Sequence, residues 1–197
     1  MNTIPTFHDP VHDAQRTFRC ALDALARPAR WHALPAVSEP LPGLSPAATA
    51  LALTLLDQEV SVWLGAGSRD AADSLRFACG VTIAEAPERA DFAFVAAPEF
   101  ESLSAFAAGS EWAPEAGATV ILEVAGQTGD TGLVCSGPGL AAATPLHCDG
   151  LPPALIAEWG RGSGGTSCGV DVVLVTDRGL AALPRSVHLQ EAACTPQ

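Results

Sequence analysis

Five charged residues lie in otherwise apolar stretches of the sequence, and their chemistry suits the recognition of an anion: Arg76, Glu115, Asp171, Arg185 and His188. Guanidinium groups bind phosphate-like anions through paired hydrogen bonds, and nearby carboxylates can orient them. Asp171 belongs to a run typical of a buried strand, where a carboxylate is costly unless Arg or other donors satisfy it. Two interpretations therefore stay open: an Arg-lined anion pocket with carboxylates that orient it, or a structural Asp–Arg pair.

Two histidines four residues apart, His8 and His12, have the spacing of a metal-binding pair on a helix. Pro10 lies between them and disfavours helical backbone at the residue before it, so His8 is expected to leave that face. The preferred interpretation is a helix start, with either Asp9 or Asp13 as the N-cap. We therefore predict no metal site.

Other catalytic signatures are weak or missing from the sequence. His147 and Cys148 are neighbours in an expected loop, and adjacent side chains rarely point together as a base and its nucleophile must. The sequence has no G-x-S-x-G elbow and no G-x-G-x-x-G turn after a strand. It contains ten Arg and no Lys, which excludes both a pyridoxal phosphate Schiff base and a P-loop lysine. We expect no cofactor, and the catalytic residues stay unknown.

The elements that position these residues alternate between helices and strands in the first half of the chain. Residues 13–27 are predicted to form an amphipathic helix, followed by a helix from Ser45 and Pro46 to residue 56 and by helical residues 68–79. In the first helix, five apolar residues on one arc are expected to face the core, opposite Arg16 and Arg19: Ala14, Phe18, Ala21, Leu22 and Leu25. Strands are expected at residues 60–64 and 92–95.

Strands dominate the second half. Residues 119–124 and 133–135 are predicted to flank a Gly-rich hairpin, and the apolar residues 170–176 to form a central buried strand. A helix is expected over residues 151–159, a flexible loop over residues 160–165, and late strands over residues 179–183 and 187–190. The pattern predicts an α/β fold in which helices cover a mixed sheet.

Length and charge narrow the class of protein. The 197 residues predict a single domain over residues 1–197, and the net charge of −12 disfavours binding to nucleic acid or to anionic membranes. The N-terminus lacks the pattern of a signal peptide, and the longest apolar stretch is too short to span a bilayer. Six Cys with no C-x-x-C pair are interpreted as reduced thiols. We therefore predict a soluble, cytoplasmic protein.

Five ordered stretches of the sequence resemble one known family: residues 10–19, 74–77, 113–119, 169–171 and 183–188. They contain every charged candidate named above, including Arg16 and Arg19, and together they span nearly the whole chain. Through them the chain is similar to the H subunit of the bacterial carbon–phosphorus lyase system.

The resemblance implies a role in phosphonate catabolism. It implies that the chain acts with the G, I and L subunits to form ribose 1-methylphosphonate 5-triphosphate from ATP and methylphosphonate. The radical J subunit then breaks the carbon–phosphorus bond. It also implies homodimers, contacts with the G, I and J subunits, and a fold like that of pyridoxal-phosphate-dependent transferases without the cofactor. The catalytic residues of such systems are thought to lie mainly on the I subunit.

Three hypotheses follow for the function of the chain. The first is a non-catalytic subunit needed to assemble the synthase, in which the charged candidates serve an interface or complete a partner's site. The second is a stand-alone enzyme that binds phosphorylated substrates through Arg76, Arg185 and Asp171, with His188 as general acid–base. The third is a module that captures a phosphonate or nucleotide.

Four Trp are possible dimer anchors, at positions 31, 63, 112 and 159.

Overall fold

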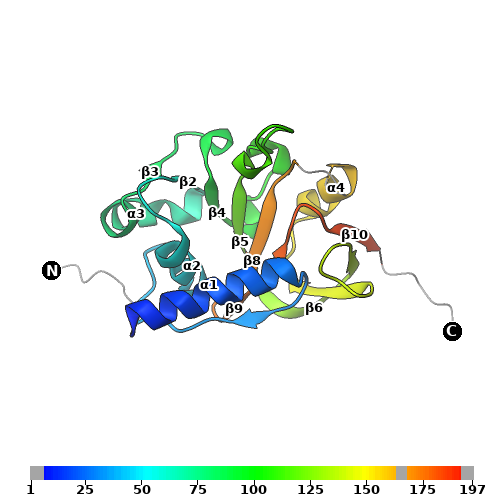
Figure 1. Ribbon diagram of the computed structural model, residues 1–197, viewed down its shortest axis with the longest axis horizontal. Coiled ribbons are helices and arrows are strands. Elements are labelled where there is room, and N and C mark those ends of the chain that lie inside the picture. The colour runs from blue at the N-terminus through cyan, green and yellow to red at the C-terminus, as the bar shows by residue number, and fades with distance from the viewer. Residues whose placement is uncertain (1–6, 163–167, 192–197) are drawn as a thin grey trace.

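A seven-stranded mixed sheet forms the centre of the chain, which a computed structural model describes over residues 7–162 and 168–191 (Figure 1). Five neighbouring strands run parallel, in the order β3 (Thr82–Ile83), β2 (Ser61–Leu64), β4 (Phe92–Ala96), β5 (Thr119–Glu123) and β8 (Asp171–Val175). At the other edge β9 (Gly179–Leu183) and β1 (His32–Ala33) are antiparallel to their neighbours. The predicted mixed sheet and the central strand within residues 170–176 are confirmed.

Alternate side chains of the central strands enter two hydrophobic cores, one on each face of the sheet. Ile121 packs in a core that includes α1 (Pro10–Ala26), α2 (Pro46–Leu55) and α3 (Ala72–Cys79). Val120 and Leu122 pack in the other core, which includes α4 (Pro153–Gly162). Since both faces are covered, these strands are apolar at nearly every position rather than at every second one.

A second, three-stranded antiparallel sheet replaces the expected Gly-rich hairpin. Its strands are β10 (His188–Glu191), β6 (Gly126–Ser136) and β7 (Thr144–Asp149), in that order. The hairpin prediction is wrong because β5 is already paired on both edges, with β4 and β8, so the chain leaves the first sheet. The loop expected at His147 is also wrong: β7 exposes His147 and buries Cys148, so these neighbours point to opposite faces.

Helix starts follow the predicted capping residues. Asp9 caps α1, since its carboxylate accepts a hydrogen bond from the backbone N–H of His12 at 3.2 Å, and Pro10 is the first helical residue. Ser45 caps α2 in the same way through Ala48. Short 3₁₀ turns complete the chain: η1 (Ala66–Ala71), η2 (Pro87–Arg89), η3 (Ala97–Glu99), η4 (Leu103–Ala105) and η5 (Pro114–Ala116).

Helix α1 is rotated relative to the predicted apolar arc. Its buried residues are mostly small or polar, namely Asp13, Thr17, Ala21 and Ala24, whereas Phe18, Leu22 and Leu25 are exposed. The small side chains let α1 pack closely on the Ala-rich α2 and on β9. Close approach of the backbones has therefore prevailed over burial of the largest apolar side chains.

Two predicted boundaries also shift. The helical stretch predicted over residues 68–79 is divided between η1 and α3, and α4 continues into the first three residues of the loop expected at 160–165. The remainder of that loop lies outside the described residues. Within residues 7–162 and 168–191, every helix is too short or too polar to cross a membrane.

Candidate functional site

Asp171 and Arg185 form a paired group at the N-terminal end of β8. The Arg185 Nη2 donates to Asp171 Oδ2 at 2.6 Å, its Nε lies 3.1 and 3.2 Å from the two carboxylate oxygens, and its backbone N–H donates to Oδ1 at 2.7 Å. The two side chains are 16% and 20% exposed for Arg185 and Asp171. The hydrogen bonds to Asp171 raise the pKa of the Arg185 guanidinium, and partial burial opposes that rise.

The same group joins three of the stretches that carry the family resemblance. The remaining nitrogen of Arg185, Nη1, donates to the carbonyl oxygen of Pro114 at 2.6 Å. A Cβ atom on Gly117 would lie 2.4 Å from the carbonyl oxygen of Gly169, so only glycine permits this approach. All three guanidinium nitrogens thus donate to protein oxygens. The geometry is that of the structural Asp–Arg pair, the second of the two interpretations left open by the sequence.

The other charged candidates are dispersed over the surface. Arg76 lies on α3 and pairs with the exposed Asp73 at 3.0 Å, with its own side chain 53% exposed. On α1, Arg16 pairs with Asp13 at 3.2 Å, and Arg19 is exposed. The two remaining candidates, Glu115 in η5 and His188 at the start of β10, are exposed as well.

Arg76 and Arg185 therefore do not meet in one pocket within the described residues, so these two residues do not form the Arg-lined pocket that was one of the two interpretations. Arg76 follows β2 on the side of β3, whereas Arg185 follows β9 at the opposite half of the sheet. Isolated, solvated ion pairs such as Arg76–Asp73 contribute little to stability and do not concentrate charge. The sequence shows that both residues lie in apolar stretches, but it does not show that α3 and β9 are far apart in the fold.

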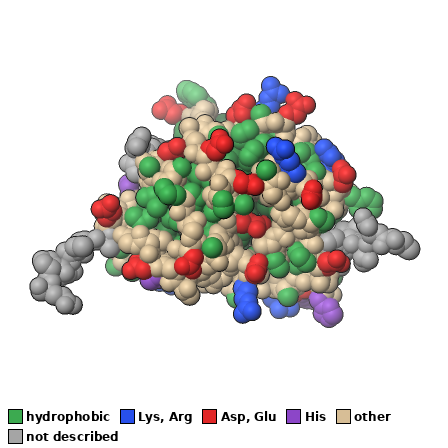
Figure 2. Space-filling model, turned by 180° about the vertical axis from the view of Figure 1, so that it is seen from behind, with side chains coloured by type: hydrophobic (Ala, Val, Ile, Leu, Met, Phe, Trp, Pro, Cys, Tyr) green, Lys and Arg blue, Asp and Glu red, His purple; other side chains and the backbone are tan. Residues whose placement is uncertain are grey.

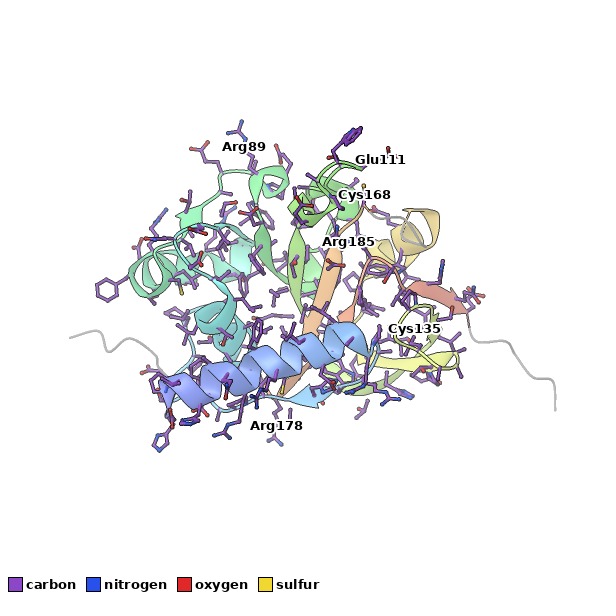
Figure 3. The ribbon with its side chains drawn as sticks, in the orientation of Figure 1. Arg89, Glu111, Cys135, Cys168, Arg178 and Arg185 are labelled. Atoms are coloured by element: carbon purple, nitrogen blue, oxygen red, sulfur yellow. The ribbon has the colours of Figure 1, made fainter. Side chains whose placement is uncertain are left out.

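A pocket of about 380 Å³ lies instead at the carboxyl ends of β5 and β8, where open α/β sheets commonly bind ligands. Its polar lining comes from three segments: Ser45, Glu123, Gln127, Thr128, Thr176, Asp177 and Arg178. Figure 3 places Arg178 at the lower edge of the molecule and Arg185 nearer its middle, so the two guanidinium groups do not share a site. The sequence held a signal for this pocket, because polar residues directly follow the apolar runs of β5 and β8.

Glu123 is a half-buried carboxyl in this pocket. Its Oε1 accepts a hydrogen bond from the backbone N–H of Ser45 at 2.9 Å, at the start of α2. Burial raises the pKa of Glu123, and the nearby carboxylate of Asp177 adds to that rise. Arg178 is exposed and makes no ion pair within the described part of the chain. One cation beside two carboxyl groups suits a small polar molecule with both donors and acceptors.

A carboxylate of the chain itself, that of Glu99, lies at the carboxyl ends of β2 and β4. The strand order reverses direction at β2, which is where such sheets often hold anionic ligands. Here Glu99 Oε1 accepts from the backbone N–H of Gly67 at 2.8 Å, and a Cβ on Gly65 would lie 2.7 Å from Glu99 Oε2. Glu99 therefore occupies the backbone N–H of Gly67 that could otherwise bind an external anion. Among the described residues, no group of three His, Cys, Asp or Glu side chains is placed to hold a metal ion.

Exposed apolar side chains mark two further surfaces. Four of them form a stripe along one flank of α1, here called the α1 stripe: Val11, Phe18, Leu22 and Leu25. Trp112 is 96% exposed in the turn before η5. The other three Trp are held within the fold: the indole of Trp31 donates to His147 O, that of Trp159 donates to Val187 O, and Trp63 packs edge-on against Phe106.

Comparison with known proteins agrees with the resemblance carried by the motifs. Residues 5–190 match the family described as bacterial phosphonate metabolism protein PhnH. The chain is 32% identical over 190 residues to the PhnH subunit of alpha-D-ribose 1-methylphosphonate 5-triphosphate synthase from Rhizobium meliloti strain 1021, and the alignment covers 93% of this chain and 94% of that relative. The chain therefore belongs to the PhnH family of bacterial phosphonate metabolism proteins.

Proposed function

We propose that this chain is a subunit of a ribose 1-methylphosphonate 5-triphosphate synthase and that its role there is assembly rather than chemistry. The observation that carries the proposal is the end-to-end similarity to a relative that bears this name. In this role the chain acts in the cytoplasm with the G, I and L subunits. The J subunit belongs to the same carbon–phosphorus lyase core complex and acts in the later step. We also propose that the chain forms a single domain. Its fold would resemble that of pyridoxal-phosphate-dependent transferases, without the cofactor.

The charge distribution supports a non-catalytic role. ATP and methylphosphonate are anions, and transfer reactions of ATP need Mg²⁺ ligands and cationic clamps around the phosphates. The chain has no Lys and a net charge of −12, and the guanidinium of Arg185 is already occupied by Asp171 and Pro114. Figure 2 shows acidic side chains spread over the face turned away from Figure 1, with fewer Arg among them. Such a surface repels both substrates at long range.

We further propose that the α1 stripe forms a homodimer with the α1 stripe of a second copy. The stripe runs along the outer flank of a 17-residue helix that lies on the surface of the molecule (Figure 1). A two-fold axis through such a face brings each apolar residue against the apolar residues of the other copy, which suits a symmetric interface. Arg16, which pairs with the buried Asp13, would lie outside this contact, where its guanidinium remains solvated.

Co-expression tests the proposed assembly. The chain is produced with its cognate G, I and J subunits, and the mixture is purified through a tag on the I subunit and analysed by size exclusion with light scattering. A defined complex that contains this chain supports the proposal, and failure to co-purify overturns it. Sedimentation of wild type, Leu22→Glu and the control Arg76→Ala at micromolar concentration tests the dimer. Only Leu22→Glu should shift to monomer, and a monomeric wild type would refute the dimer.

The guanidinium of Arg178, which lines the pocket and is in no ion pair within the described residues, supports one alternative, a module that captures a phosphonate or nucleotide. Calorimetry at low salt with ATP, and separately with methylphosphonate, distinguishes this function from assembly alone. Capture requires that Arg178→Ala abolishes binding while the complex with the partner subunits stays intact. Absence of heat with either ligand would exclude capture, whereas turnover by the chain alone would establish a stand-alone enzyme.

A further inference from the structure

Trp112 is presented at the tip of a closed turn. The backbones of Ser110 and Ala113 exchange two hydrogen bonds of 3.1 Å each, and the Ser110 hydroxyl accepts a third from the Ala113 N–H at 3.1 Å. Only Glu111 and Trp112 lie between these two residues. Gly109 precedes the turn and has a left-handed backbone, with φ of 70°. A Cβ atom at this position would lie 2.9 Å from the carbonyl oxygens of Ala113 and Pro114.

The base of this turn is fixed to the rest of the fold. Ala108 and Gly117 form a bridge beneath it, and the backbone N–H of Gly169 donates to the carbonyl oxygen of Ala108 at 2.7 Å. The Arg185 guanidinium, held by Asp171, donates to Pro114 just after the turn. The Asp171–Arg185 pair therefore holds the residue that follows the turn in place. An exposed indole on such a pre-organised turn loses little conformational freedom on binding.

The charges around Trp112 are acidic. Glu111 precedes it, and the exposed Glu115 follows within the same segment; Figure 3 shows Glu111 at the upper edge of the molecule. The guanidinium that contacts this segment, that of Arg185, is neutralised by Asp171. A second copy of this chain would offer a surface with a net charge of −12. Complementarity therefore favours a partner with basic side chains.

We infer that the turn around Trp112 is a docking point for a protein partner whose surface has an apolar pocket rimmed by Lys or Arg. Trp112 fills the pocket, and Glu111 and Glu115 pair with the rim. Trp is the residue type most enriched among those that dominate binding energy, and an acidic rim fixes orientation and speeds association. The inference rests on the proposed function, because the partner is taken to be another subunit of the same assembly.

The test uses the full chain and the complex of cognate G, I and J subunits, immobilised for biolayer interferometry. Trp112→Ala should weaken binding by about 30-fold or more, whereas Phe77→Ala, an aromatic side chain 76% exposed on α3, should bind like wild type. Glu111→Lys with Glu115→Lys should slow association at low salt by roughly tenfold, with a smaller difference at 0.5 M NaCl. Thermal unfolding of each variant should match wild type, since these side chains are exposed.

Each outcome decides a separate question. If wild type does not bind the partner complex at all, the proposed function fails and the inference falls with it. If wild type and Trp112→Ala bind equally, the proposed function stands and the docking point is wrong. If Trp112→Ala instead converts a dimer to a monomer in sedimentation, Trp112 docks on a second copy, and the basic partner is refuted. Protection of Trp112 from iodide quenching in the complex, lost in the variant, would support the inference directly.

Discussion

Arg185→Ala provides a direct test of whether the Asp171–Arg185 pair stabilises the fold or binds a ligand. The substitution removes the guanidinium hydrogen bonds to Asp171 and Pro114, and a hydrogen bond to a charged group is worth about 1.5–3 kcal/mol. Breaking a fully buried pair costs about 3–5 kcal/mol. Asp171 is 20% exposed and keeps the backbone N–H of residue 185, so the loss should be somewhat smaller.

We therefore expect the free energy of unfolding to fall by about 2–4 kcal/mol. At about 2–4 °C per kcal/mol for a domain of this size, Tm should fall by roughly 5–15 °C. Urea denaturation followed by tryptophan fluorescence and far-UV circular dichroism measures the free energy. Asp171→Ala and the double variant complete a cycle whose coupling energy should reach at least about 1 kcal/mol.

Arg76→Ala is the matched control, because it removes an Arg from an exposed pair with Asp73. Its free energy of unfolding should change by no more than about 0.5 kcal/mol. If Arg185→Ala is as stable as this control, the structural interpretation is refuted. An anion-binding Arg185 would show the reverse pattern, with unchanged stability and lost affinity for ATP or methylphosphonate.

Three further outcomes are expected from the geometry. Gly117→Ala should destabilise the fold by about 1–3 kcal/mol in urea titrations, because its Cβ would lie 2.4 Å from a carbonyl oxygen; an unchanged midpoint would contradict this packing. Burial raises the pKa of Glu123 above its ordinary 4.5, so the folded state holds that proton more tightly and stability falls as pH rises through the window just above 4.5. Glu123→Gln should lose less stability than wild type between pH 4.5 and 7, and equal losses would argue against the shift. Burial raises the pKa of Cys135 to about 12 and that of Cys148 to about 11, so neither thiol should react with Ellman's reagent at pH 8 before unfolding, and rapid labelling of both would show that they are accessible.

Local signals in the sequence predicted most of the elements. Asp9 and Ser45 precede proline at helix starts, where a side-chain acceptor satisfies free backbone N–H groups, and both cap helices in the structure. The apolar run ending at Val175 is buried on both faces, as a central strand must be. These predictions succeed because the interactions that decide them lie within a few residues of one another.

Errors arose where partners come from distant parts of the chain. The rotation of α1 depends on the Ala-rich surfaces of α2 and β9, so Phe18 and Leu22 are exposed despite their place on the apolar arc. The path of β6 depends on the fact that both edges of β5 are already paired. Neither fact can be obtained from periodicity, which reports on a segment and not on its neighbours.

For the candidate site too, part of the description follows from the sequence and part only from the fold. The sequence alone established an acidic chain with ten Arg and no Lys, the caps and strands, and the motifs that identify the PhnH family. Only the tertiary structure decided the surroundings of three of these Arg: Arg185 is neutralised by Asp171, Arg76 is solvated, and Arg178 lines the pocket at the carboxyl end of β8. The physical reason is that a charge acts through the groups within a few ångströms of it, and the fold brings those groups together from distant positions in the chain.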